Sequence, residues 1–433
     1  MKRRSLRLVL CTLAAVAIIA CGTAAAQTVN LAAIRAVGSE RYAEAEIIRA
    51  SGLTVGTEVS PQDLQEAIDR LAESGVFAAV SYRAEPFGAA LAVEFHVADA
   101  AQFLHCRFDN FVWFSKKQLR EELVSRVPLF RDQIPVTGRL SELIVAALSD
   151  LLREQGVRGR VASYPSGPAG GEIGALLFRV EGVVIPIRRV TFPGAAQLDL
   201  ALLEVASQPL LQADYRESFV RIFAELDLRP LYLQRGYLRV FFEEPIAELV
   251  GGDPGEPTVN VAIPIREGSQ YLLGELLWLG NTVSPSSELA EYITLTQGHP
   301  ANAIQLQDDV EKVSELYGTR GYVRAVVQRT PTIDDAERTV SYELRVREGD
   351  LYRMGELEIT GLDAGSVERL RGAWRLPTGA PFDTSYLDRF FREIPRYLPR
   401  SRLQNLRVSR QQSVDENNKT VNISIQFLPQ SGR

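Results

Sequence analysis

The side chains that could carry out acid–base or metal chemistry are few and scattered. The sequence has only three histidines, which fall in separate predicted elements: His96, His105 and His299. The acidic pairs Glu243-Glu244 and Asp308-Asp309 are neighbours in sequence, and neighbouring side chains usually point in different directions. No Ser or Cys motif places a base within the hydrogen-bond reach that a nucleophile needs. We therefore expect no enzyme, no catalytic residue and no small-molecule substrate.

Two other stretches suggest ligand binding at first sight but fit strand connections better. The acids Asp334-Asp335 lack the ligand spacing of a calcium loop. The glycine-rich residues 167–174 are not followed by the Lys-Ser/Thr and helix of a phosphate-binding loop. Both predict hairpin loops, so we expect no metal site and no cofactor.

The charge balance argues against nucleic acid as a partner. The full chain has a net charge of −6. Its leader contains Lys2, Arg3, Arg4 and Arg7 and no acid, so removing the leader makes the chain more acidic. Nucleic-acid binding needs a basic surface instead.

The N-terminus has the pattern of a secretion signal over residues 1–26. Positive residues precede an apolar stretch, Leu8 to Ala20, that is short for a membrane span. Two processing sites remain open: simple cleavage after Ala26, or a lipobox-like site that would put a lipid on Cys21. Either one predicts a periplasmic protein. Two of the three cysteines lie in this leader, and Cys106 is expected to be a buried strand thiol.

After the leader, one order of predicted helices and strands recurs with a period of about 80 residues. A glycine followed by an apolar or aromatic residue marks the end of a second helix, at Gly75, Gly156, Gly236 and Gly321. A second marker, Glu-Gly, closes the pattern at Gly182, Gly268 and Gly349. The elements between the markers read strand, helix, helix, strand, strand. Because each period is long enough for its own core, the chain reads as a row of small domains.

These modules resemble POTRA domains, the periplasmic modules of outer-membrane barrel-assembly proteins of the BamA type. The resemblance is carried by the start of the first module (residues 33–38) with Gly75-Val76-Phe77, by Gly280-Asn281 with Gly321-Tyr322, and by residues 351–361 with Gly379. It implies an α+β fold, a tandem, elongated array of five POTRA-like β-α-α-β-β units. We number these modules one to five: residues 27–100, 101–182, 183–268, 269–349 and 350–433.

The resemblance also implies where partners bind. In POTRA domains the third strand is central, so the second strand is a sheet edge with unpaired backbone groups, to which an extended client can add as a strand. We place these edges at residues 76–83, 157–164, 237–243 and 322–328, with no interior proline. The candidate protein-binding residues are Phe77, Val80, Tyr82, Tyr237, Val240, Tyr322 and Val326.

Module five departs from the pattern, because Arg400 and Arg402 flank the position of the expected glycine-aromatic pair. Between Ser366 and Gln412 there are ten arginines and four acids. Arginine suits carboxylates and phosphates, so this face could dock an acidic partner or a membrane surface, or could be a solvated helix face. The candidate docking residues are Arg389, Arg392, Arg396, Arg400 and Arg402.

A sixteen-stranded barrel needs on the order of 250 residues, which the chain after module five does not supply. The sequence therefore predicts a stand-alone scaffold or a piece of a longer protein. Two functions remain open. One is a chaperone-like scaffold in outer-membrane protein assembly or secretion, with an outer-membrane β-barrel protein and unfolded clients as partners. The other is a structural rod linking envelope or division complexes.

Overall fold

The computed structural model describes residues 28–167, 173–251, 253, 255–399, 403 and 406–429. The predicted signal segment with Cys21 lies outside these residues, as do Arg400 and Arg402. The chain forms two compact units, Met1–Val184 with Gly251–Pro257, and Ile185–Val250 with Thr258–Arg433. The first holds modules one and two and the second holds modules three to five.

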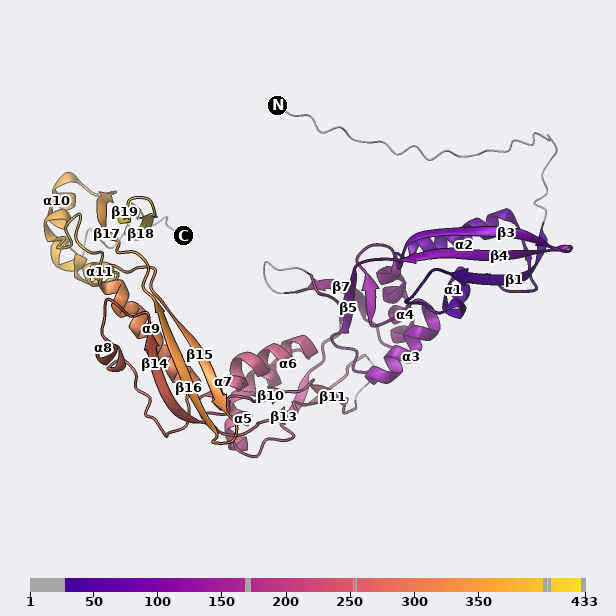
Figure 1. Cartoon of the computed structure of the whole chain (residues 1–433), viewed down its shortest axis with the longest axis horizontal. Coiled ribbons are helices and arrows are strands. Elements are labelled where there is room, and N and C mark those ends of the chain that lie inside the picture. The colour runs from indigo at the N-terminus through magenta and orange to yellow at the C-terminus, as the bar shows by residue number, and fades with distance from the viewer. Residues whose placement is uncertain are drawn as a thin grey trace, which may run out of the picture. The chain divides into compact units, whose positions relative to one another are not determined.

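Module one shows the arrangement that the other modules repeat (Figure 1). Its strand β1 (Val29–Val37) runs parallel to the central strand β4 (Ala90–Asp99), and β3 (Phe77–Phe87) pairs antiparallel with β4 on the other side. The helices are α1 (Glu44–Ser51) and α2 (Pro61–Glu73). Helix α2 begins where the sequence predicts, because Ser60 caps it and Asp63 bonds back in a capping box.

Module two repeats this order with β5 (Phe103–Phe108), α3 (Lys116–Arg126), α4 (Leu140–Glu154), β7 (Arg160–Ser166) and β8 (Ala175–Glu181). Its sheet order is β6-β5-β8-β7, where β6 is Gln133–Pro135. Buried leucines of α4, among them Leu148 and Leu152, face the sheet and supply the core.

Module three has a more broken helical layer. It comprises β9 (Ile187–Thr191), α5 (Leu200–Ala206), a 3₁₀ turn (Gln208–Gln212), α6 (Glu217–Phe223), a π turn (Ala224–Leu228) and α7 (Arg229–Leu233). Its main sheet has the order β11-β12-β9, with β11 at Ile246–Leu249 and β12 at Val259–Ala262. Strands β10 (Phe241–Phe242) and β13 (Ile265–Arg266) form a separate pair.

Modules four and five contain the longest hairpins of the second compact unit. In module four the elements are β14 (Leu272–Leu279), α8 (Ser286–Ala290), α9 (Ala303–Thr319), β15 (Val326–Asp334) and β16 (Thr339–Arg347). In module five they are β17 (Arg353–Thr360), α10 (Ala364–Ala373), α11 (Tyr386–Tyr397), β18 (Leu406–Asp415) and β19 (Thr420–Pro429). The hairpin turns fall at Asp334-Asp335 and Asn417-Asn418, as the sequence predicts.

The predicted α+β fold class is confirmed. Each predicted module holds one sheet in which the third strand is central, parallel to the first strand and antiparallel to the second. Four modules end the first strand at a glycine with positive φ. At Gly280 a Cβ atom would lie 2.5 Å from the carbonyl oxygen of Val346, so the close approach of strand ends requires glycine. The module boundaries themselves stay predictions.

Candidate functional site: the free sheet edges

The edge formed by the first strand is covered at its start in every sheet of this type. In modules one and two the short strands β2 (Glu58–Val59) and β6 pair with it. In modules three to five single bridges stand in their place: Pro186 with Asp214, Leu272 with Pro300, and Arg353 with Pro381. The loop before the second helix thus supplies main-chain partners, as where the Met354 amide donates to Ala380 at 2.8 Å.

The opposite edge, formed by the second strand, is free. Strands β3, β7, β11, β15 and β18 each end the sheet order, and among the described residues no further strand pairs with them. A free edge presents a row of unpaired N–H and C=O groups that an extended chain can bind. The candidate binding site in each module is therefore a row of backbone groups.

The predicted residues of module one lie at or near this edge. Phe77 begins β3 but is buried and contacts Tyr42 edge-to-face, with ring centroids 5.6 Å apart. Val80 and Tyr82 follow on the helix-covered face, opposite Val97 and Phe95 of β4. Tyr82 is 38% exposed, so part of its ring could contact a bound chain.

The predicted strand starts in modules three and four are wrong. Tyr237 and Val240 are buried and precede β10, and Tyr322 precedes β15, so none of the three lies in an edge strand. Val326 does begin β15 and is 52% exposed. In these modules an extra turn follows the glycine: the Tyr322 amide bonds the Tyr317 carbonyl at 3.0 Å, and the Ala325 amide bonds Tyr322 at 3.0 Å. The aromatic ring consequently packs into the core rather than along the edge.

The expectation that the edges contain no interior proline is also wrong. The strands extend further toward their hairpins than predicted, and the added residues include Pro86 in β3, Pro165 in β7 and Pro331 in β15. Proline cannot donate a main-chain hydrogen bond, so it changes what an edge can bind. Strand β18 contains no proline.

The second compact unit also contains two clusters of polar side chains that the sequence analysis did not predict. Between modules four and five, Glu416 accepts a hydrogen bond from the Tyr352 hydroxyl and pairs with Arg324 at 2.7 Å. Between modules three and four, Asp335 accepts from the Tyr271 hydroxyl at 2.6 Å and pairs with Arg239 at 3.0 Å. We call these two sets the Tyr–acid–Arg clusters.

Both Tyr–acid–Arg clusters stand beside the glycine marker. Each arginine lies three residues after the glycine, and the amide of each tyrosine donates to the glycine carbonyl at 2.8 Å, from Tyr271 to Gly236 and from Tyr352 to Gly321. The repeat of Gly-Tyr-x-Arg was the available signal. The acids come from hairpin turns more than ninety residues beyond the arginines, and no local pattern connects them.

The Glu-Gly marker has a structural role in modules three and four. Glu348 accepts from the Val283 amide at 2.8 Å and from the Tyr317 hydroxyl at 3.0 Å, tying the first-strand turn to the second helix. Burial alone would raise the pKa of Glu348, but the hydrogen bonds from the Thr282 hydroxyl, the Val283 amide and the Tyr317 hydroxyl hold it below its usual value. Burial, and then the bond to Glu348, raises the pKa of Tyr317 to about 12. Glu267 and Tyr232 repeat the bond at 3.0 Å.

Three of the five predicted docking residues lie on helix α11. Arg389, Arg392 and Arg396 are spaced three and four residues apart, which places them on one face of the helix. Arg389 pairs with Asp383, and Arg396 approaches Glu393 at 3.5 Å. Part of the positive charge is therefore neutralised within the module, and what this face binds stays a prediction.

The remaining reactive side chains are apart from one another. His96 is on β4, 3.0 Å from Glu94; His105 is on β5; and His299 is in the loop before α9. Cys106 lies on β5 and is partly buried. Burial, with a smaller contribution from Asp132, raises the pKa of its thiol to about 12, so the thiolate is scarce at neutral pH.

Comparison with known proteins identifies module four. The sequence model of the POTRA family, described as a surface antigen variable number repeat, matches residues 271–349. Residues 271–349 are therefore identified as a POTRA domain. The match falls on module four, whose free edge strand and both neighbouring Tyr–acid–Arg clusters are described above. The predicted likeness to the periplasmic arm of BamA-type proteins is confirmed.

Two curated relatives cover part of the chain. The outer membrane protein assembly factor BamA of Neisseria meningitidis serogroup B is 26% identical over 131 residues, which is 30% of this chain and 16% of the relative. A putative outer membrane protein assembly factor of Treponema pallidum is 32% identical over 178 residues, 38% of this chain and 20% of the relative. The chain therefore spans a fifth or less of the length of these relatives.

Among solved structures, the crystal structure of Haemophilus influenzae BamA POTRA3-5 covers 57% of this chain and 96% of its own, with 20% identity and a TM-score of 0.44. In the part of the chain that the structure describes, no helix is long and apolar enough to cross a membrane.

Proposed function

We propose that this chain is a periplasmic POTRA module of outer-membrane protein assembly or secretion, which binds extended segments of unfolded outer-membrane clients by strand addition. One observation carries the proposal. The same sheet recurs with the start of its first-strand edge covered and its second-strand edge free, and a free edge is what backbone recognition of an extended chain requires. The similarity to two assembly factors supports the same conclusion.

The second part of the proposal is docking on an outer-membrane β-barrel protein through module five. Arg389, Arg392 and Arg396 form a basic helix face on an otherwise acidic protein, which favours an acidic partner surface. Arg400 and Arg402 extend this charge in sequence. An anionic membrane surface is the competing partner, and a lipid on Cys21 would act in the same direction.

The test is site-specific photo-crosslinking in intact cell envelopes. One probe replaces Arg396, and a second replaces Val326, which is exposed at the start of a free edge, whereas Tyr322 is not. Crosslinks from Arg396 to an outer-membrane barrel protein, and from Val326 to nascent barrel segments, are the expected result. Crosslinks only to inner-membrane or division proteins would contradict the proposal and favour the linking rod.

The role of the backbone has its own test. Val80 and Pro86 are separated by an even number of residues in β3, so their backbone nitrogens face the same side, the free edge. Val80→Pro therefore removes an outward amide while the hydrogen bonds between β3 and β4 remain. Client capture at module one should fall. Equal capture by such variants at every edge would exclude strand addition.

A further inference from the structure

The free edges are not equivalent, because proline interrupts some of them. A proline in an antiparallel strand must lie where its nitrogen faces away from the neighbouring strand, since that position needs no amide donor. Pro86 pairs with Leu91, Pro165 with Leu176 and Pro331 with Tyr342. Each proline therefore directs its nitrogen toward the free edge and removes one of the donors that an added strand would use.

The hairpins of modules four and five allow a residue-by-residue comparison. Both close with a four-residue loop, between Asp334 and Thr339 and between Asp415 and Thr420. Pro331 lies three residues before the closing aspartate of the first hairpin. The residue in the same place of the second hairpin is Gln412. At the position where Pro331 leaves β15 without an amide donor, Gln412 gives β18 an ordinary backbone amide.

The phase of the ladder then defines the open groups of β18. Alternate residues direct their main-chain groups to the same side of an antiparallel strand. The groups of Val408, Arg410, Gln412 and Val414 therefore face the free edge. Strand β11 also lacks proline, but it has four residues against ten in β18 and offers half the ladder or less.

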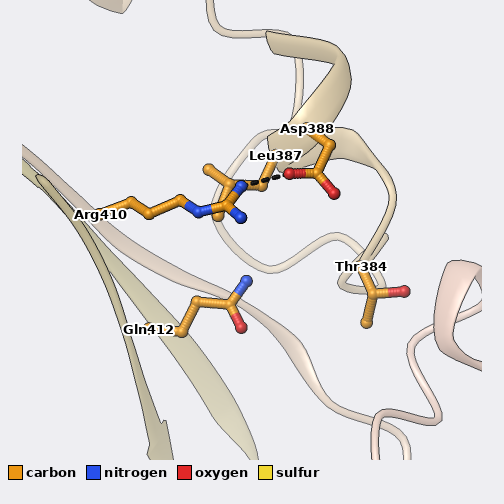
Figure 2. Close-up of a pocket in the computed structure, with 5 residues that line it drawn as sticks. All are labelled: Thr384, Leu387, Asp388, Arg410 and Gln412. Carbon is orange, nitrogen blue, oxygen red and sulfur yellow. Dashed lines mark hydrogen bonds and ion pairs between the residues drawn. The ribbon is translucent and has the colours of Figure 1, made fainter. Parts of the chain in front are cut away.

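A hollow lies directly beside these groups. It has a volume of about 290 Å³ and is lined by Thr384, Leu387, Asp388, Arg410 and Gln412. Figure 2 shows Arg410 and Gln412 projecting from β18 toward the start of helix α11, with Arg410 paired to Asp388. The side chains of a strand added to β18 would alternate between this hollow and solvent. The hydroxyl, amide and charged groups of the lining suit a polar side chain.

We propose that β18 and the hollow beside it, rather than the edges of modules one, two and four, form the principal site for extended client segments. This inference rests on the proposed function and narrows it to one strand. The preferred segment is extended, lacks proline over the length of the strand, and places an amide or hydroxyl side chain in the hollow.

The experiment measures binding of a fluorescent peptide to the full chain. The peptide has about ten residues, alternating valine and threonine, with terminal glutamates for solubility. Gln412→Pro should weaken binding about tenfold or more, because it removes an outward amide and imposes ring bulk. Gln412→Ala keeps the amide and should stay within about threefold of the native chain. Pro331→Gln should create an additional site on β15.

The outcomes separate this inference from the proposed function. If the native chain binds the peptide but Gln412→Pro binds it equally, the assignment to β18 is overturned and strand addition occurs at another edge. A Pro331→Gln variant that gains no binding would overturn the blocking role of proline, even if Gln412→Pro failed to fold. If Gln412→Pro instead converts a dimer to a monomer in sedimentation, the occupant of β18 is a second copy and the client assignment falls. If no extended peptide binds the native chain, the proposed function itself fails.

Discussion

The junction between modules one and two and the junction between modules four and five place the same residue at the same point but surround it differently. At the first, Gly75 packs against Gly138, and the neighbouring contacts are the Arg41 guanidinium 3.8 Å from the centre of the Phe103 ring and the Arg139–Glu73 ion pair at 3.0 Å. At the second, Gly321 faces Tyr352, whose hydroxyl belongs to a Tyr–acid–Arg cluster.

The comparison shows which part of the junction the fold requires. The glycine is common to both, because the backbones approach too closely for a side chain and φ is positive. The polar partners differ: the first junction has an arginine over a phenylalanine ring and an exposed ion pair, whereas the second has a tyrosine hydroxyl bonded to an acid. Substitutions of the polar partners can therefore change the stability of a junction while the glycine contact keeps its position.

The largest expected effect is that of adding a methyl group at the glycine. In Gly321→Ala the new Cβ would lie 2.7 Å from the Tyr352 carbonyl oxygen, and φ is +95°, so we expect a loss of about 2–3 kcal/mol in the free energy of unfolding. Urea unfolding followed by tryptophan fluorescence measures it. Gly298→Ala is the matched control, because φ is +79° but the space around it is open. Equal losses would mean that backbone strain alone, not the junction, matters.

Alkaline pH should weaken module four next. The pKa of Tyr317 is raised to about 12, whereas an unfolded tyrosine titrates near 10, so the folded state holds its proton more tightly. The contribution of protonated Tyr317 to the free energy of unfolding is fully present below about pH 10. It declines as the pH rises toward 12, by at most about 1.4 kcal/mol per pH unit. Tyr317→Phe should flatten this decline in pH-dependent urea unfolding. An unchanged slope would exclude the Tyr317–Glu348 bond as its source.

Removing one hydroxyl tests the Tyr–acid–Arg cluster directly. Tyr352→Phe deletes the donor to Glu416 but keeps the ring that packs in the junction, so we expect a loss of about 1–2 kcal/mol. Differential scanning calorimetry of the full chain measures it. Tyr82→Phe, on the partly exposed edge of β3, is the control and should change stability little. If both variants lose equally, the cluster contributes nothing specific.

The smallest effect should come from the exposed ion pair of the first junction. Arg139→Ala removes a side chain that is 60% exposed and pairs with Glu73 and Glu142, so we expect little or no loss in the free energy of unfolding, and less still in high salt. The backbone bond from the Arg139 amide to Glu73, at 2.7 Å, remains. A loss comparable to that of Tyr352→Phe would show that polar contacts contribute equally to the stability of the two junctions.

Much of the fold could be predicted from local sequence. Helix α2 at Pro61–Glu73 and the turns at Asp334-Asp335 and Asn417-Asn418 depend on capping and turn residues that act within a few positions. The glycine period indicated the repeat for the same reason. The central position of the third strand came from the family resemblance.

The site was harder to predict because it depends on contacts between distant residues. Whether Tyr322 begins a strand or fills the core is decided by its contact with the Tyr317 ring, at 6.2 Å between centroids. The two-residue strand β2 has no periodicity to detect. The importance of Pro331 appears only once its register with Tyr342 is known.

The covered start of the first-strand edge has a consequence for how strands can be added. A sheet with two open edges can be extended from both sides, and copies can then stack without limit, as in fibrils. Here the loop before the second helix covers the start of the first strand in every such sheet. Continuous stacking on that side is therefore obstructed, so we expect each module to take an added strand at its second-strand edge.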